Sequence, residues 1–286
     1  MSDEKSASVN TASRTASVQD HYDRLDRFYR QLWGEHVHHG LWTDPSFTPE
    51  EAVRHLVRRV AEDAGLTAGD RVCDVGCGYG APARFWARTY DAEVTGFTVS
   101  DAQKAHAERQ SVQGPTPTYH LRDFLENDRP ADHFDAVVAI ESLTHIHDQP
   151  GVLREAARLL RPGGRLVACV WMADSAPSAW KQRFLLDPIV EEGRLSGLPT
   201  AAHLYRWTTE AGLSVEQLDD VTSLVRRTWT VVLRRFAGAL LTDPTVLRTL
   251  LDSSESERVF ARTILRIWLA QHTGALRYGW LVAVND

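Results

Sequence analysis

The chain has 286 residues, of which 43% are hydrophobic, and it carries a net charge of -6. This length accommodates one substantial core with a small cap, and the lack of a basic excess argues against nucleic acid or an anionic membrane surface as a partner. The three cysteines, Cys73, Cys77 and Cys169, form no Cys-x-x-Cys pair, which argues against a disulfide framework and against a zinc site.

The N-terminal quarter of the chain falls into a tail and a helical segment. Residues 1–16 are small and polar and predict a disordered tail. Over residues 17–64 we expect a helical lid, because aromatic and aliphatic residues recur at helical spacing from Val18 to Trp33 and Pro49 is well placed to begin a second helix. No stretch has the apolar length of a signal peptide or a membrane span, so we expect a cytoplasmic protein without membrane insertion.

Short strands alternate with helices between residues 65 and 172. The predicted strands are Arg71–Val75, Ala92–Thr98, Thr116–Leu121, Phe134–Ile140 and Arg165–Val170, and the predicted helices are Ala81–Tyr90, Asp101–Ser111 and Gly151–Leu160. This order predicts an α/β, Rossmann-like fold with a mostly parallel sheet covered on both faces. Ligands bind such sheets at the carboxyl ends of the strands.

The alternation breaks after Met172. Residues 173–212 predict an inserted helical cap, 213–224 a sixth strand, 226–271 mostly helix, and Leu276–Val284 a last strand. We therefore divide the chain into the tail, the lid, a ligand-binding core over 65–172, and a region over 173–286 that holds the cap and the strands that complete the core.

The most informative segment is the run from Val72 to Gly80, in which a strand ends at an acid and three glycines follow at alternate positions. Glycines at 76, 78 and 80 let the backbone turn sharply and approach a ligand closely. Asp74 can receive a cationic α-amino group, and Gly80 comes earlier than the third glycine of a dinucleotide fingerprint. A structural glycine turn is the alternative interpretation.

This acid-x-Gly-x-Gly-x-Gly run resembles the first motif of class I methyltransferases that use S-adenosylmethionine (SAM). The resemblance implies SAM as cofactor, bound by Asp74, Gly76, Gly78 and Gly80, and a sheet whose last strand is antiparallel. It also implies that SAM lies at the carboxyl edge of the sheet.

Five positions later in the chain support the resemblance. A Gly-x-Thr-x-Ser run followed by a glutamine is similar to the tocopherol-methyltransferase-like and cyclopropane-synthase-like groups, which makes Thr98 and Gln103 candidates for the ribose hydroxyls. Asp123 matches the acid that binds the adenine amino group, with Phe124 packing on the ring, although Asp123 could instead be a helix N-cap. By the same resemblance, Glu141 lies beneath the sulfonium.

Residues 33–42 resemble the tocopherol-methyltransferase-like group and the bacterial natural-product group, which includes sugar O-methyltransferases of the rebeccamycin type. Residues 273–279 resemble the tocopherol group. The sugar enzymes have two adjacent histidines where this chain has Thr144-His145, and an acid where it has Trp171. These departures weaken the case for a sugar hydroxyl, whose pKa is far above that of imidazole. An amine, a carbon nucleophile or a phenol remains open as the acceptor.

His145 is the first candidate for acid–base catalysis, because the resemblance places it at a strand end that faces the methyl group; a structural histidine is the alternative. His39 could approach the substrate, and Tyr22 could touch the cofactor from the lid. His36, His38 and His39 lack the carboxylate or cysteine that would complete a metal site, so we expect no metal.

We therefore predict a SAM-dependent methyltransferase that acts on a hydrophobic small molecule of natural-product biosynthesis, at carbon, nitrogen or oxygen. The many aromatic residues after Trp171 suit such a substrate, although most of them must be core. A methyltransferase-like cyclase that keeps SAM as a structural element is the main alternative, and a non-catalytic SAM-binding protein is a third. The sequence is compatible with a homo-oligomer and predicts no nucleic-acid partner.

Overall fold

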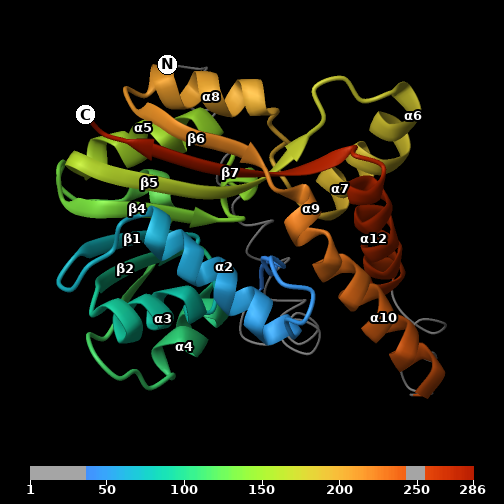
Figure 1. Ribbon diagram of the computed structural model, residues 1–286, viewed down its shortest axis with the longest axis horizontal. Coiled ribbons are helices and arrows are strands. Elements are labelled where there is room, and N and C mark those ends of the chain that lie inside the picture. Colours follow the sequence, from blue (N-terminus) through green and yellow to red (C-terminus); the bar gives the residue numbers. More distant parts are fainter. Residues whose placement is uncertain (1–36, 243–254) are drawn as a thin grey trace.

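The computed structural model describes residues 37–242 and 255–286, and it contains a seven-stranded sheet with the order β3-β2-β1-β4-β5-β7-β6 (Figure 1). The strands are β1 (Arg71–Val75), β2 (Glu93–Thr98), β3 (Thr118–Leu121), β4 (Phe134–Ile140), β5 (Leu160–Ala173), β6 (Ser214–Asp220) and β7 (Leu276–Val284). The first five strands are parallel, and β7 runs antiparallel to β5 and β6. The predicted α/β, Rossmann-like sheet with an antiparallel last strand is therefore confirmed.

Helices cover both faces of the sheet and extend beyond one end of it (Figure 1). They are α2 (Pro49–Asp63), α3 (Ala81–Tyr90), α4 (Asp101–Glu108), α5 (Gln149–Leu159), α6 (Ala179–Lys181), α7 (Asp187–Glu192), α8 (Ala201–Glu210), α9 (Thr222–Val225), α10 (Arg227–Thr242) and α12 (Glu255–His272). The described residues also form two short 3-10 helices, η1 (Phe124–Glu126) and η2 (Leu143–His145), and one short π-helix, η3 (Gln182–Leu186).

Two core layers follow from the alternation of side chains along the strands. On β1, Val72 packs with α2 and α3, whereas Cys73 and Val75 pack with α5 and α8 on the other face. A third cluster joins η3, α7, α10 and α12 beside the end of the sheet. The inserted helical segment expected over 173–212 is present as α6, η3, α7 and α8.

Most predicted boundaries agree with the structure, and β1, α3, β4 and β7 begin and end at the predicted residues. The fifth strand differs, because the sequence predicts it over Arg165–Val170, whereas β5 starts at Leu160 and ends at Ala173. Leu160 pairs with Phe134, and the register shifts before the pairing continues at Arg165.

The tail over 1–16 and the helix predicted over Val18–Trp33 lie outside the described residues. None of the helices that the structure describes combines the length and apolar character needed to cross a membrane.

Candidate functional site

A cavity of about 810 Å³ opens at the carboxyl ends of β1, β2 and β4. Eight sequence-predicted residues line it: Gly76, Gly78, Thr98, Gln103, Asp123, Phe124, Glu141 and His145. Asp74, Gly80 and His39 are not among the lining residues, and Tyr22 lies outside the described part of the chain. The parallel strands bring most of the expected residues to one edge, as the topology requires.

The three glycines of the loop after β1 differ in what surrounds them. A Cβ on Gly76 would lie 2.4 Å from the Cβ of Ser142, and one on Gly80 would lie 2.4 Å from the Tyr119 hydroxyl oxygen. Gly78 has a φ of +52°, and a Cβ there would meet no described atom within 4 Å. Gly76 and Gly80 therefore allow close packing within the protein, whereas Gly78 leaves room on the cavity side.

Asp74 is the penultimate residue of β1 and pairs with Gly96 of β2 and Val138 of β4, at the centre of the sheet. Its side chain is buried, and among the described residues its Oδ2 has no hydrogen-bond partner. Burial raises the pKa of this carboxyl from 3.8 to about 7. A buried acceptor without a donor is costly, so the site fits a ligand that brings an ammonium group.

The opposite end of the cavity suits a nucleoside. The Thr98 hydroxyl donates to Oε1 of the buried Gln103 at 2.9 Å, which leaves the Gln103 amide as a donor. Asp123 accepts the Leu125 N–H at 3.0 Å through Oδ1 and caps η1, so the N-cap interpretation holds for one carboxylate oxygen. The Phe124 ring packs edge-on against Phe97, with 5.9 Å between ring centroids.

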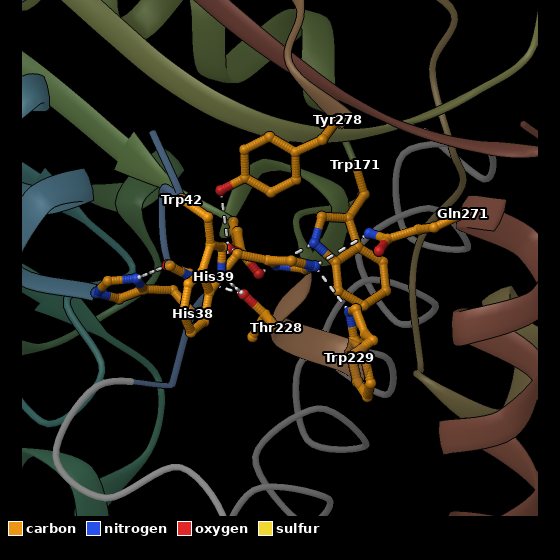
Figure 2. A network of polar contacts seen from close by, with 10 residues as sticks. His38, His39, Trp42, Trp171, Thr228, Trp229, Gln271 and Tyr278 are labelled. Carbon is orange, nitrogen blue, oxygen red and sulfur yellow. Dashed lines mark hydrogen bonds and ion pairs between the residues drawn. The ribbon is translucent and has the colours of Figure 1, made fainter. Parts of the chain in front are cut away.

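Glu141, which follows β4 with a φ of +57°, anchors a polar network. Its partners His39, Trp171 and Tyr278 are labelled in Figure 2. Its Oε1 accepts from the backbone N of His39 at 2.7 Å, from His39 Nδ1 at 2.9 Å and from the Tyr278 hydroxyl at 2.8 Å. Its Oε2 accepts from Trp171 Nε1 at 3.0 Å. Burial alone would raise the pKa of Glu141, but the Coulombic attraction of His39, the hydrogen bonds that His39 donates and the attraction of His38 outweigh it and lower this pKa to about 2.

The second nitrogen of His39 faces the C-terminal helices. Trp229 Nε1, on α10, lies 2.7 Å from His39 Nε2, and Gln271 Nε2, on α12, lies 3.0 Å from the same atom (Figure 2). An indole N–H can only donate, so Nε2 carries the lone pair and Nδ1 carries the hydrogen given to Glu141. Both ring nitrogens of His39 are thus engaged inside the protein, away from the cavity wall.

His145 ends η2 and lines the cavity with its neighbours Ile146 and His147. Across from it the cap contributes apolar side chains: Leu186, Val190, Leu195 and Leu198. Within the described residues, no group of three or more histidines, cysteines and carboxylates is placed to hold a metal ion.

Sequence reasoning missed Trp229, Gln271 and Tyr278 as members of the Glu141 network. The sequence pattern around each of these three residues predicts a helix or a strand but no hydrogen bond to Glu141. Trp171 had been noted for its place after the fifth strand, but not for the hydrogen bond that its indole makes to Glu141.

Comparison with known proteins gives a consistent result. Residues 9–262 match the model of the family described as mycolic acid cyclopropane synthetase. The chain is 37% identical to 27-O-demethylrifamycin SV methyltransferase of Amycolatopsis mediterranei (strain S699), over 76% of this chain and 80% of that protein. It is 35% identical to Methyltransferase GfsG of Streptomyces halstedii, over 77% and 80% of the two chains.

Two solved structures are also similar. The mycolic acid cyclopropane synthase CmaA1 complexed with SAH and CTAB has a TM-score of 0.84 at 20% identity, covering 94% of this chain and 98% of that one. The [4+2]-cyclase SpnF has a TM-score of 0.79 at 26% identity, covering 95% and 97%.

Proposed function

The chain belongs to the mycolic acid cyclopropane synthetase family of SAM-dependent class I methyltransferases, and from this premise we propose that it methylates a hydrophobic small molecule of natural-product biosynthesis. SAM is its cofactor. The observation that carries the proposal is a cavity among the described residues that runs from the glycine loop to the cap, whose largely apolar wall also holds Asp187, Glu191 and Arg194. An extended apolar substrate fits a cavity of that kind.

We assign the cofactor contacts from the surroundings of each residue. Asp74 offers its Oδ2 to the ammonium group of SAM, and Gly78 leaves the space in which the amino-acid part lies. The Gln103 amide is available for the ribose hydroxyls, because Thr98 occupies its carbonyl oxygen. The remaining oxygen of Asp123 and the ring of Phe124 serve the adenine.

His145 is the proposed acid–base residue. When bound, SAM supplies an electrophilic methyl group, so the protein has only to align the acceptor, exclude water and accept a proton. His145 lines the cavity between the glycine loop and the cap, where an acceptor atom would lie. Imidazole is basic enough to take the proton of a phenol or an ammonium group near neutral pH, and it suits an aliphatic hydroxyl less well.

Glu141 and His39 have a supporting role in this proposal. The carboxylate of Glu141 accepts four hydrogen bonds, and its pKa of about 2 makes it a poor proton acceptor. His39 has both ring nitrogens engaged with protein partners. We therefore assign proton transfer to neither residue, and we assign both to holding the end of β4.

A methyltransferase-like cyclase remains the second candidate, because the [4+2]-cyclase SpnF has a similar fold at 26% identity. The two reactions differ in what happens to the cofactor. Methyl transfer converts one SAM to S-adenosylhomocysteine (SAH) per turnover, whereas a cyclase leaves SAM unchanged.

The experiment measures SAH formation with a panel of phenolic, amine and macrolactone acceptors. We expect acceptor-dependent SAH formation, which His145→Gln lowers by about 100-fold or more, the usual size of a general-base contribution. His133→Gln is the matched control, because His133 directly precedes β4, at the end of that strand away from the cavity, and does not line the cavity. Full activity in His145→Gln would contradict the assignment of the base.

A further inference from the structure

The loop between α7 and α8, residues 193–198, is fixed to the turn that carries His145. We call it the cap loop. Ser196 donates its backbone N–H to the carbonyl of Thr144 at 2.8 Å. Its hydroxyl oxygen lies 2.9 Å from the same carbonyl and 2.7 Å from the carbonyl of Ile146. These two carbonyls flank His145, so the cap loop holds η2 on both sides of that residue.

Gln149, at the start of α5, also forms hydrogen bonds to the cap loop. It is buried, with 6% of its surface exposed, and its Nε2 donates to Ser196 Oγ at 3.1 Å and to the Gly197 carbonyl at 3.0 Å. A hydroxyl has one hydrogen to donate and two lone pairs. Ser196 can therefore accept from Gln149 while its hydrogen is shared between the two carbonyls.

The same loop forms part of the cavity wall. Arg194, Leu195 and Leu198 line the cavity together with His145. A substrate that packs on this wall contacts the segment that fixes the histidine turn. Movement of the cap loop would therefore move the backbone on either side of His145.

We propose that Ser196 and Gln149 are positioning residues that couple substrate binding at the cap loop to the placement of His145. The proposal rests on the proposed function, in which His145 is the acid–base residue. It is separate from cofactor binding, because the hydrogen bonds of the Ser196 and Gln149 side chains join the cap loop to η2 and its C-cap residue Ile146. A displacement of about 1 Å in a catalytic group can cost about 100-fold in rate.

The test compares Ser196→Ala with Ser196→Thr, which keeps the hydroxyl. We expect Ser196→Ala to lower kcat by about 10- to 100-fold, with the KM for SAM and the calorimetric affinity for SAH unchanged. The pH at which kcat rises should stay the same, because His145 remains the base, and Ser196→Thr should restore most of kcat. Ser214→Ala is the matched control, since Ser214 is an exposed serine bonded to Asp286 at the far end of the sheet.

Gln149→Met gives a second, independent variant, because it removes both amide donors while roughly keeping the side-chain volume. We expect the same selective loss of kcat, and faster hydrogen exchange of the amides of residues 143–149. Wild-type kcat and unchanged exchange in both variants would overturn the coupling. If His145→Gln stays active while exchange over 143–149 still increases in Ser196→Ala, the junction holds and the assignment of the base is what fails.

Discussion

Asp74 couples cofactor binding to a change in the protonation of its own carboxyl group. Its carboxyl lies at the end of the central strand, and burial raises its pKa to about 7. Because this pKa is above the ordinary 3.8, the free protein is more stable with Asp74 protonated and loses part of that stability as pH rises toward 7. A bound ammonium group reverses the preference and favours the carboxylate.

We therefore expect the affinity for SAH to increase with pH up to about 7. Binding must displace the proton of Asp74, so affinity should fall about tenfold per pH unit below that value. Calorimetry between pH 5.5 and 7.5 should show a loss of about twentyfold at the acid end. Asp74→Asn, which cannot ionise, should bind weakly and without this slope; a slope that persists in Asp74→Asn would assign the proton elsewhere.

Gly76 and Gly78 should respond differently to alanine. In Gly76→Ala the new Cβ would lie 2.4 Å from Ser142 Cβ, so we expect destabilisation by a few kcal/mol and a lower Tm. In Gly78→Ala the positive φ costs about 1–2 kcal/mol, but the Cβ meets no described atom within 4 Å and the protein should fold. Its SAH affinity should nevertheless fall, because the methyl group takes cofactor space. Tight SAH binding by folded Gly78→Ala would contradict that placement.

At the scale of elements, the His39 network joins segments that are distant in the sequence. His39 lies within the predicted lid, and Glu141 follows β4. Trp229 and Gln271 come from α10 and α12 (Figure 2). The neutral imidazole acts as donor at one nitrogen and acceptor at the other. It thereby holds the two C-terminal helices against the cofactor edge of the sheet.

We expect His39→Ala to destabilise the protein by about 2–4 kcal/mol, because it removes the imidazole donor from the Glu141 carboxylate and the acceptor of a buried indole, while the backbone N–H of residue 39 remains. Trp229→Phe removes the indole N–H alone and should cost about 1–2 kcal/mol. Chemical denaturation of both variants and of the double variant gives the coupling between the two side chains. A double variant whose loss equals the sum of the single losses would show that the Trp229–His39 bond contributes nothing.

The features that could be predicted from the sequence are those whose pattern lies within a short stretch of the chain. The end of β1 and the glycine loop combine an apolar run, an acid and spaced glycines within ten residues, so the strand and its ligand site were found together. The interactions of His39 span 102, 190 and 232 residues of sequence. No local sequence pattern indicates contacts between residues so far apart, and for that reason the sequence predicts His39 only as a residue that could approach the substrate. The packing of Gly80 against Tyr119 likewise could not be predicted from a local sequence pattern.

At the scale of the whole molecule, the sheet carries the cofactor edge and the cap closes one side of the cavity. The C-terminal helices α10 and α12 pack against η3 and α7 of the cap. Residues 37–42, the described part of the predicted lid ahead of α2, pack on the sheet and the helices that follow it. Trp42 N donates to the Leu224 carbonyl at 2.8 Å, Gly40 N donates to Thr228 Oγ1 at 3.0 Å, and Val37 lines the cavity. These contacts place the end of the lid between the sheet and α10.

The lid itself remains a prediction. We expect SAH to slow hydrogen exchange throughout residues 18–42, since the cofactor and this segment would stabilise each other's bound form. Hydrogen-exchange mass spectrometry with and without SAH measures this directly. Protection limited to the glycine loop would make the segment a static packing element.

The most direct test of the central claim follows the methyl group itself. The protein is incubated with SAM labelled in the methyl group and the acceptor panel, and the products are analysed by mass spectrometry. The account predicts that one labelled methyl group appears in a product, that SAH forms in equal amount, and that SAH cannot replace SAM. An unlabelled, rearranged product, formed equally well with SAH, would contradict methyl transfer and identify a cyclase.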